Sequence, residues 1–351
     1  MRTKSILLFV IVILLSLGFT QKSPTPIYFE VPKGWPKTTY DFKKNPITEE
    51  GVKLGRYLYY ETLLSKNNQI SCENCHFWGS VFSNRDHHQS HGDKNKMGIR
   101  NSISLMNLAW SKSFMWDGSH TKLETMAKNP ITNPLEMNEN IDHIIHKLNQ
   151  TELYPKMFKN AFGDEMINEK NILNALGQFI VTFVSSNSKY DKVMRNEAVF
   201  NENEIKGYEI FKNKCAKCHQ EPLFTNQEFM HNGLPIDSSL NDMGRMKISN
   251  IKNDYLKFKV PTLRNVQYSS DYMHDGRFET IREVLEHYNS IKKSVLIPKE
   301  LKKPMNFSKD DLTNLELFLE TLSDVSFIKN KNLRFPEERL EKKEEKTNNR
   351  K

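Results

Sequence analysis

Apolar residues recur at helical spacing in several stretches of the chain, and these stretches define its predicted elements. One helix is predicted to begin after a cap at Thr48 and to run to about Leu64. A second begins at Asn201, whose capping partner three residues on is Glu204. Each half then closes with a strongly amphipathic helix, and the second of these starts at Ser308. Their apolar faces are formed by Ile172, Leu176, Phe179 and Phe183 and by Leu312, Leu315, Leu319 and Leu322. The pattern predicts a mostly α-helical protein.

A five-residue pattern, C-x-x-C-H, follows the first helix of each half. The two copies use all four cysteines of the chain, and their chemically active residues are Cys72, Cys75 and His76 in the first and Cys215, Cys218 and His219 in the second. Two thiols at this spacing can form thioethers with the vinyl groups of one porphyrin, and the adjacent histidine can bind its iron. A disulfide or a zinc site is the alternative, since paired C-x-x-C motifs also occur in zinc ribbons. A zinc ribbon does not require a histidine after the second cysteine of both copies. We therefore predict two covalently bound haem c groups.

The order of helix, haem motif, loops and closing helix is typical of a cytochrome c domain, and it occurs twice. A chain of 351 residues also exceeds what one core usually holds. We predict two cytochrome c-like domains, an N-terminal one over residues 46–195 and a C-terminal one over residues 196–328, each with one haem c. The Pro-containing segment 21–45 is predicted to be an extended lead-in. The charged segment 329–351 is predicted to be a disordered tail.

The N-terminus indicates export. Arg2 and Lys4 precede an apolar run that ends near Leu17, and small residues around Gly18 offer a cleavage site. This layout predicts a signal peptide within residues 1–20 and a periplasmic protein, with an uncleaved membrane anchor as the alternative. Export agrees with the haem motifs, because haem c is attached outside the cytoplasm. The formal net charge of +8 is spread along the chain without a basic stripe interleaved with aromatic residues, which argues against nucleic acid as a partner.

An internal repeat extends beyond the haem motifs and distinguishes the two halves. Residues 116–118 (WDG) match residues 274–276 (HDG), and an apolar stripe at helical spacing follows each. Where a cytochrome c domain presents its sixth iron ligand, the first stripe has Pro130 and the second has Tyr288. Proline cannot bind iron, so we predict an open first haem that peroxide can reach and a closed second haem suited to electron transfer. From the stripe alone, Tyr288 could also be a core tyrosine, and Met273 is a competing ligand.

An ordered set of short motifs is similar to those of the bacterial di-haem cytochrome c peroxidases. It is similar also to those of a related di-haem enzyme that matures tryptophan tryptophylquinone in methylamine dehydrogenase. The resemblance covers about residues 45–325. It rests on SCENCH at 71–76, RNS at 100–102, FMWDG at 114–118, NPLEM at 133–137, CAKCH at 215–219, VPTLRN at 260–265 and YMHDG at 272–276.

This resemblance implies roles for individual residues. His76 matches the proximal ligand of the peroxidatic haem, and His219 matches that of the electron-transfer haem. Glu136 matches the distal acid–base glutamate, and Trp116 matches the tryptophan placed between the haems. In resting peroxidases a histidine of the loop after the first motif can occupy the open haem. His91 is the best match for it, with a solvated polar loop as the alternative.

The resemblance also implies contacts around the haems. Asn101, with backbone carbonyl groups near Ser269 and Asp271, matches a calcium site between the domains. Arg264 and His274 are expected to contact the edge or the propionates of a haem.

The chain departs from the common peroxidase pattern at two positions. The well-known peroxidases have a methionine ligand where this chain has Tyr288. The tryptophylquinone-maturing enzyme has a tyrosine at that position, and it also has a proline where this chain has Pro130. Where peroxidases have a distal glutamine, this chain has Met126. A phenolate ligand at Tyr288 would stabilise oxidised iron.

Three functions are compatible with these observations. The first is reduction of hydrogen peroxide to water with electrons from a small cytochrome c or copper protein, which is the function we expect. The second is peroxide-dependent oxidation of a residue in a protein substrate, as the match at Tyr288 indicates. The third is electron transfer without catalysis by a di-haem cytochrome. The family resemblance also points to a homodimer.

Overall fold

The computed structural model describes residues 23–84, 87–163, 166–291 and 297–338. The expected signal peptide or anchor, residues 1–20, therefore lies outside the described residues. Within the described ranges the chain is mostly helical, as predicted, and its one sheet is a short antiparallel pair of strands. No helix in these ranges is long and apolar enough to cross a membrane.

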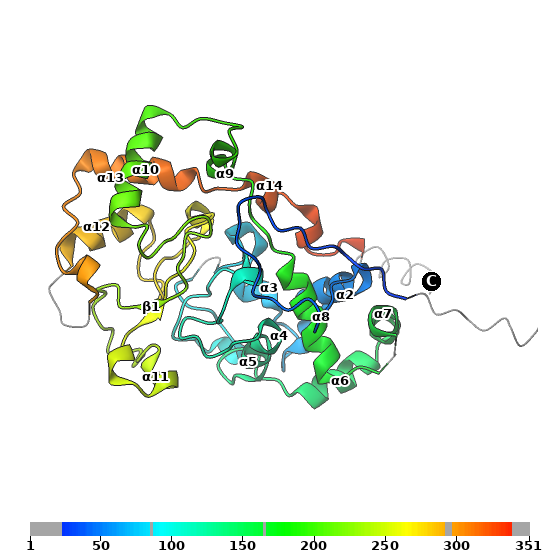
Figure 1. Cartoon of the computed structure of the whole chain (residues 1–351). Coiled ribbons are helices and arrows are strands. Elements are labelled where there is room, and N and C mark those ends of the chain that lie inside the picture. The colour runs from blue at the N-terminus through cyan, green and yellow to red at the C-terminus, as the bar shows by residue number, and fades with distance from the viewer. Residues whose placement is uncertain (1–22, 85–86, 164–165, 292–296, 339–351) are drawn as a thin grey trace, which may run out of the picture.

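The helices occur in two groups along the chain, and in Figure 1 most members of the first group lie on the opposite side of the molecule from most members of the second. The exceptions are the helix at residues 189–194, whose Tyr190 packs in the core of the second half, and the helix at residues 325–328, whose Phe327 packs in that of the first. The first group comprises α2 (Glu49–Tyr59), α3 (Cys72–Cys75), α4 (Leu123–Met126), α5 (Lys128–Thr132), α6 (Ile141–Asn149), α7 (Leu153–Phe162), α8 (Glu169–Val181) and α9 (Lys189–Met194). The second comprises α10 (Glu202–Lys214), α11 (Met246–Ser249), α12 (Ile281–Ser290), α13 (Lys309–Glu320) and α14 (Val325–Ile328). The strands β1 (Phe229–Met230) and β2 (Phe258–Lys259) pair Phe229 with Lys259. Short 3₁₀ turns include η1 (Thr62–Leu64), η4 (Leu108–Trp110), η6 (Val266–Tyr268) and η8 (Lys331–Leu333).

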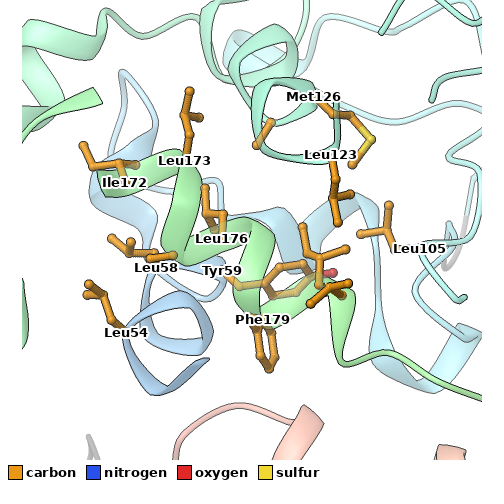
Figure 2. Close-up of a cluster of buried hydrophobic side chains, with 14 of the residues drawn as sticks. Leu54, Leu58, Tyr59, Leu105, Leu123, Met126, Ile172, Leu173, Leu176 and Phe179 are labelled. Carbon is orange, nitrogen blue, oxygen red and sulfur yellow. The ribbon is translucent and has the colours of Figure 1, made fainter. Parts of the chain in front are cut away.

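The core of the first half forms where α2 crosses α8. Leu54 and Leu58 of α2 and Leu176 and Phe179 of α8 are fully buried there (Figure 2). The helices approach closely at Gly55, where an added Cβ atom would lie 1.9 Å from a backbone oxygen of α8. This crossing fixes the helix that leads into the first C-x-x-C-H motif.

The second half repeats this arrangement with α10 and α13. Gly207 lies at their crossing, where an added Cβ atom would come within 2.0 Å of the carbonyl oxygen of Asn314. Both predicted helix starts are confirmed, because Asn201 with Glu204 and Ser308 with Asp311 form capping boxes. α10 ends at Lys214, so the second motif begins directly at its C-terminus.

Three expectations differ from the structure. The helix expected to reach Leu64 ends at Tyr59, because the Glu61 side chain accepts a hydrogen bond from the backbone of Leu63 and starts a separate 3₁₀ turn. The single helix expected along the first apolar stripe is divided into α4 and α5, and Pro130 lies in the first turn of α5, where its missing N–H is tolerated.

The third difference concerns the charged tail, which begins later than residue 329. Arg56 of α2 donates hydrogen bonds to the carbonyl oxygens of Lys331, Arg334 and Phe335. Tyr60 donates to the carbonyl of Leu333, and Leu333 is buried. The segment after α14 therefore returns to cover the first half of the protein.

Candidate functional site

The first C-x-x-C-H motif forms a single helical turn, α3. The backbone N–H of Ser71 donates to Oδ1 of Asn74 at 2.8 Å, which fixes the start of the turn. Residues three apart on a helix share a face, so Cys72 and Cys75 lie on the same side of α3. His76 follows directly, and its backbone N–H donates to the carbonyl of Cys72 at 2.9 Å.

The His76 ring is held in the state that a metal ligand needs. Its Nδ1 lies 2.9 Å from the carbonyl oxygen of Phe82. A carbonyl only accepts, so Nδ1 carries the proton and Nε2 keeps a free lone pair. Burial lowers the pKa of His76, which keeps the ring neutral. These features fit an axial ligand of a haem iron.

The second motif has the same local geometry at the end of α10. The backbone N–H of His219 donates to the carbonyl of Cys215 at 3.0 Å. Its Nδ1 lies 3.2 Å from the carbonyl oxygens of both Phe224 and Pro261. Burial lowers the pKa of His219 to about 4, so this ring is also neutral with Nε2 free.

The four cysteines are not paired with each other. All four are free thiols, and burial raises the pKa of Cys72 and of Cys215 to about 12. In the described part of the chain, no three His, Cys, Asp or Glu side chains converge as a metal cluster. The two C-x-x-C pairs therefore form two separate sites, rather than one zinc-ribbon cluster.

A cavity of about 250 Å³ lies beside the second motif. Its surface is mainly apolar, and the residues that line it include Cys215, Cys218, His219, Tyr288 and Met273. α12 carries Tyr288 into this cavity, as the repeat register predicts. An apolar cavity that brings both thiols and the histidine of the motif together with a tyrosine fits a haem.

Tyr288 and Met273 both line this cavity, but their environments differ. Nδ2 of Asn232 lies 3.2 Å from the sulfur of Met273, so that sulfur already has a polar partner. Tyr288 makes no hydrogen bond through its hydroxyl to another described residue. Burial raises the pKa of Tyr288, so the phenol would lose its proton only in contact with a strong positive charge such as ferric iron.

Glu136 lies close to the first motif. Burial raises the pKa of the Cys75 thiol to about 11, and the negative charge of Glu136 adds to this rise. Burial likewise raises the pKa of Glu136, against the effect of Asn133, whose Nδ2 donates to Oε1 of the carboxylate at 2.7 Å. Pro130 of α5 contacts the same segment, since its carbonyl accepts from the backbone of Met137 at 3.0 Å. The structure thus joins the proline to the segment that carries the glutamate beside the first motif.

The histidine-containing loop contacts this glutamate segment. The backbone N–H of Asp93 donates to the carbonyl of Glu136 at 2.7 Å. The rings of His87 and His91 lie 4.7 Å apart, edge to face. His88 instead contacts the second half, with Nδ1 2.8 Å from Oδ1 of Asp271. His91 therefore lies on a loop that borders the first site, and its role as a resting-state ligand stays a prediction.

Trp116 lies between the two halves. Its ring lines the cavity of the second motif, and its Nε1 donates to the carbonyl of Asn101 at 2.8 Å. Arg100 fixes the same region, because its guanidinium contacts both Asp117, the next residue after Trp116, and Asp242. This placement fits a relay between two haems, and that role stays a prediction.

The residues expected at a calcium site lie together, and Asn101 and Asp271 among them are buried. Nδ2 of Asn101 donates to the carbonyl oxygen of Asp271 at 2.8 Å, and Oγ of Ser269 contacts the same oxygen at 3.3 Å. Oδ1 of Asn101 is buried and has no hydrogen-bond partner among the described residues. An unpartnered buried oxygen beside further oxygen atoms fits a hard cation such as calcium.

Arg264 and His274 both line the cavity of the second motif, but only one of them has a free polar atom. Arg264 is fully buried and donates to both carboxylate oxygens of Asp191, at 2.9 and 2.7 Å, as well as to the carbonyl of Pro222. His274 stacks on Phe258 with ring centroids 3.6 Å apart, and burial lowers its pKa to about 4. Nδ1 of His274 is buried without a partner among the described residues, so it is the freer of the two to bind a haem propionate.

One residue of this cavity escaped the motif analysis. Lys259 is buried, lines the cavity and contacts the carbonyl oxygen of Ser113 through Nζ at 2.5 Å. Burial lowers its pKa to about 8. The residue directly precedes the VPTLRN motif, and the internal repeat aligns it with Asn101. Extending the repeat register upstream from the Asp-Gly pair would have found it.

Comparison with known proteins places the chain among di-haem proteins. Residues 49–199 match the family described as di-haem cytochrome c peroxidase. Methylamine utilization protein MauG of Methylorubrum extorquens is 33% identical over 293 residues, which are 80% of this chain and 80% of that protein. Cytochrome c551 peroxidase of Nitrosomonas europaea is 30% identical over 285 residues, which are 79% of this chain and 81% of that protein.

Solved structures show the same fold. A crystal structure of a MauG-like protein associated with microbial copper homeostasis has a TM-score of 0.82 at 26% identity, and the match covers 88% of this chain and 99% of that chain. The diheme peroxidase BthA from Burkholderia thailandensis has a TM-score of 0.72 at 19% identity over 88% of this chain and 92% of that chain.

Proposed function

Because the chain belongs to the di-haem cytochrome c peroxidase family, an oxidoreductase family whose name implies two haem groups, we propose that it reduces hydrogen peroxide to water. The reaction consumes one peroxide, two electrons and two protons and releases two water molecules. The observation that carries the proposal is the asymmetry between the two sites. Glu136 lies beside the first motif on a segment that Pro130 contacts, whereas Tyr288 lies in the cavity of the second.

We propose that each C-x-x-C-H motif holds one haem c within its own cytochrome c-like domain. The cysteines of each motif would carry the thioether bonds, and His76 and His219 would be the proximal ligands. When bound, the haems supply the redox chemistry, with the peroxide-reducing iron on the His76 side. The protonated Nδ1 atoms of both histidines support this assignment, because each hydrogen bond orients Nε2 away from the backbone.

Glu136 would move the proton. Reduction of peroxide requires a proton to leave the proximal oxygen and reach the distal oxygen, which departs as water. Burial raises the pKa of the carboxyl group above its ordinary value, and the hydrogen bond from Asn133 fixes one of its oxygens. An oriented carboxylate with a raised pKa is suited to accepting and then donating one proton at the operating pH.

Electrons would enter at the second site from a small cytochrome c or copper protein. Lys214 and Lys217 are exposed and border the cavity that contains Cys215 and Cys218. Lys217 forms an ion pair with Glu300 of the same rim, so the positive charge that remains there is that of Lys214. Positive charge at this rim would favour an acidic donor, in agreement with the net charge of +8. Trp116, which lines the same cavity and bonds to Asn101, would connect the second site to the first.

A cation, most simply calcium, would hold the two halves together at Asn101. Its ligands would include Oδ1 of Asn101 and backbone oxygens near Ser269 and Asp271, which belong to the other half. The unpartnered buried oxygen of Asn101 supports this assignment. We further propose export to the periplasm, because haem c is attached there and residues 1–20 read as a signal sequence.

A second function is favoured by Tyr288. A tyrosine ligand stabilises oxidised iron and would make the second haem a poorer acceptor of electrons from a donor protein. Such a site is better suited to the oxidation of a residue in a protein substrate. The similarity to methylamine utilization proteins agrees with this alternative without assigning the reaction.

Steady-state kinetics separates the two functions. Purified holoprotein would be mixed with hydrogen peroxide and either a reduced acidic cytochrome c or a reduced acidic copper protein. Turnover in the range typical of enzymes, about 1–10³ per second, supports the peroxidase. Consumption of peroxide only when a protein substrate is added favours the oxidation of a protein residue. If no form of the holoprotein has a high-spin haem and peroxide is never consumed, both enzyme functions fail and an electron-transfer cytochrome remains.

A further inference from the structure

The two halves of the protein are locked together by reciprocal backbone contacts. Trp116 and His274 are 158 positions apart (274 − 116), and the same offset relates Asn101 to Lys259. It also relates the 3₁₀ turns η4 (Leu108–Trp110) and η6 (Val266–Tyr268). A single offset without gaps therefore superimposes the central segment of one half on that of the other.

Hydrogen bonds cross between the halves in pairs that this offset relates. The backbone N–H of Asn101 donates to the carbonyl of His274 at 2.8 Å, and that of Lys259 donates to the carbonyl of Trp116 at 2.7 Å. Asn101 and Lys259 are repeat partners, and the two residues that they contact, His274 and Trp116, are repeat partners as well. The contact between the halves is built twice, once from each side.

The side chains follow the same symmetry. Nδ2 of Asn101 contacts the carbonyl oxygen of Asp271 at 2.8 Å, and Nζ of Lys259 contacts the carbonyl oxygen of Ser113 at 2.5 Å. Ser113 and Asp271 are themselves related by the offset of 158 (271 − 113). The ammonium of Lys259 therefore takes the position that corresponds to the amide group of Asn101.

The chemistry of the two positions is complementary. At Asn101 a buried oxygen lacks a donor, which fits the binding of a cation. At Lys259 the protein supplies a cation of its own, and among the described residues no carboxylate forms an ion pair with it. Lys259 is only 6% exposed and lines the cavity together with His219 and Trp116. The ring centroid of Phe114 lies 6.0 Å from Nζ.

We propose that Lys259 is the covalently tethered counterpart of the cation at Asn101 and that its charge raises the reduction potential of the haem held by His219. This inference rests on the proposed haem at the second motif. Reduction of that haem adds one negative charge to a cavity of low dielectric constant, and a nearby ammonium that no carboxylate neutralises stabilises the reduced form. Lys259 thus opposes the effect of a phenolate ligand at Tyr288, which stabilises the oxidised form. It is a positioning residue, since it acts through the cofactor and does not touch peroxide.

The test is a spectroelectrochemical titration of the holoprotein, in which the midpoint potentials of both haems are followed without peroxide. Lys259→Met removes the charge at similar volume, Lys259→Arg retains it, and Lys252→Met makes the same neutralising change at an exposed position of the same half. We expect Lys259→Met to lower the equilibrium constant for reduction of one haem about tenfold, which corresponds to about 59 mV for one electron. Lys259→Arg and Lys252→Met should leave both potentials near those of the wild type.

Midpoint potentials that do not change in Lys259→Met protein carrying both haems by mass spectrometry would overturn the proposal. Equal shifts in both haems would overturn it as well, because Lys259 lines the cavity that contains Cys215, Cys218 and His219. If the Met variant does not load haem, Lys259→Gln retains a donor to Ser113 while removing the charge, and the same outcomes apply. Since no peroxide is used, a protein without peroxidase turnover still gives a clear answer, so failure of this inference is distinguishable from failure of the proposed function.

Discussion

Replacement of Glu136 by glutamine tests the proposed proton transfer most sharply. The amide retains an oxygen that can accept the hydrogen bond from Asn133, which now measures 2.7 Å, and its volume matches that of the carboxylate. It cannot accept a proton from peroxide. General acid–base catalysis by a positioned side chain contributes about 10²–10⁴-fold. We therefore expect the second-order rate constant for peroxide to fall by that factor, equivalent to about 2.7–5.4 kcal/mol of transition-state stabilisation at 1.36 kcal/mol per decade.

The assay is stopped-flow absorbance of the haem bands, with peroxide mixed against protein in its peroxide-reactive redox state. Glu169→Gln is the matched control, because that residue is half-exposed and forms only a surface ion pair with Lys128. The wild-type rate should fall as the pH is lowered through the pKa of Glu136, since only the ionised carboxylate accepts a proton. Burial raises this pKa, so the fall should begin at a higher pH than for an ordinary glutamate.

Asn133→Ala adds a second, independent readout. Its hydrogen bond opposes the effect of burial, so the loss of that bond should raise the pKa of Glu136 further and move the pH profile to higher pH. The reasoning is refuted if Glu136→Gln changes the peroxide rate by less than about threefold while both haems remain bound. It is refuted as well if the Gln variant keeps the acid limb of the wild-type profile.

Three further predictions concern stability. Gly55→Ala should destabilise the protein by about 1–3 kcal/mol in chemical denaturation, because the new Cβ atom would lie 1.9 Å from a backbone oxygen at the α2–α8 crossing. Gly98→Ala is the control and should be close to neutral, because the nearest atom to its new Cβ would be 3.7 Å away. Arg264→Met should cost about 3–5 kcal/mol, since it leaves a buried carboxylate at Asp191. Burial alone would raise the pKa of Asp191, but the hydrogen bonds from Arg264 outweigh this effect and lower the pKa. The Arg264–Asp191 pair therefore stabilises the wild type above about pH 4, and this stabilisation is lost as the pH falls through the lowered pKa. A wild-type stability that does not change with pH below about pH 4 in a series of unfolding curves would contradict this prediction. Removal of calcium with a chelator should lower the melting temperature of the wild type, and the loss of this effect in Asn101→Ala would assign the cation site.

Much of the helical framework could be predicted from the sequence, because its signals are local. The capping boxes at Asn201 and Ser308 lie next to the apolar stripes that they start, and both helices begin where predicted. The C-terminal limit of the first helix could not be predicted in the same way. The apolar pattern alone would allow this helix to continue to Leu64. The helix ends earlier because the Glu61 side chain caps a separate 3₁₀ turn.

The repeat register predicted that Tyr288 would lie near the second motif, and the structure places it in that cavity. Contacts between distant segments gave no signal of this kind. The pairing of Arg264 with Asp191 joins residues far apart in sequence, so a free arginine that faces a haem propionate was an equally good reading of the VPTLRN motif. The return of Leu333 to the first half was likewise hidden within a charged segment.

The difference between the two haem sites is the central claim, and electron paramagnetic resonance of the ferric protein tests it most directly. The wild type should give two distinct signals, one high-spin from the site beside Pro130 and one from the site closed by Tyr288. In Tyr288→Phe protein with both haems bound, only the second signal should change. Two identical signals in the wild type, or a spectrum that Tyr288→Phe leaves unaltered, would contradict the asymmetry on which the proposed function rests.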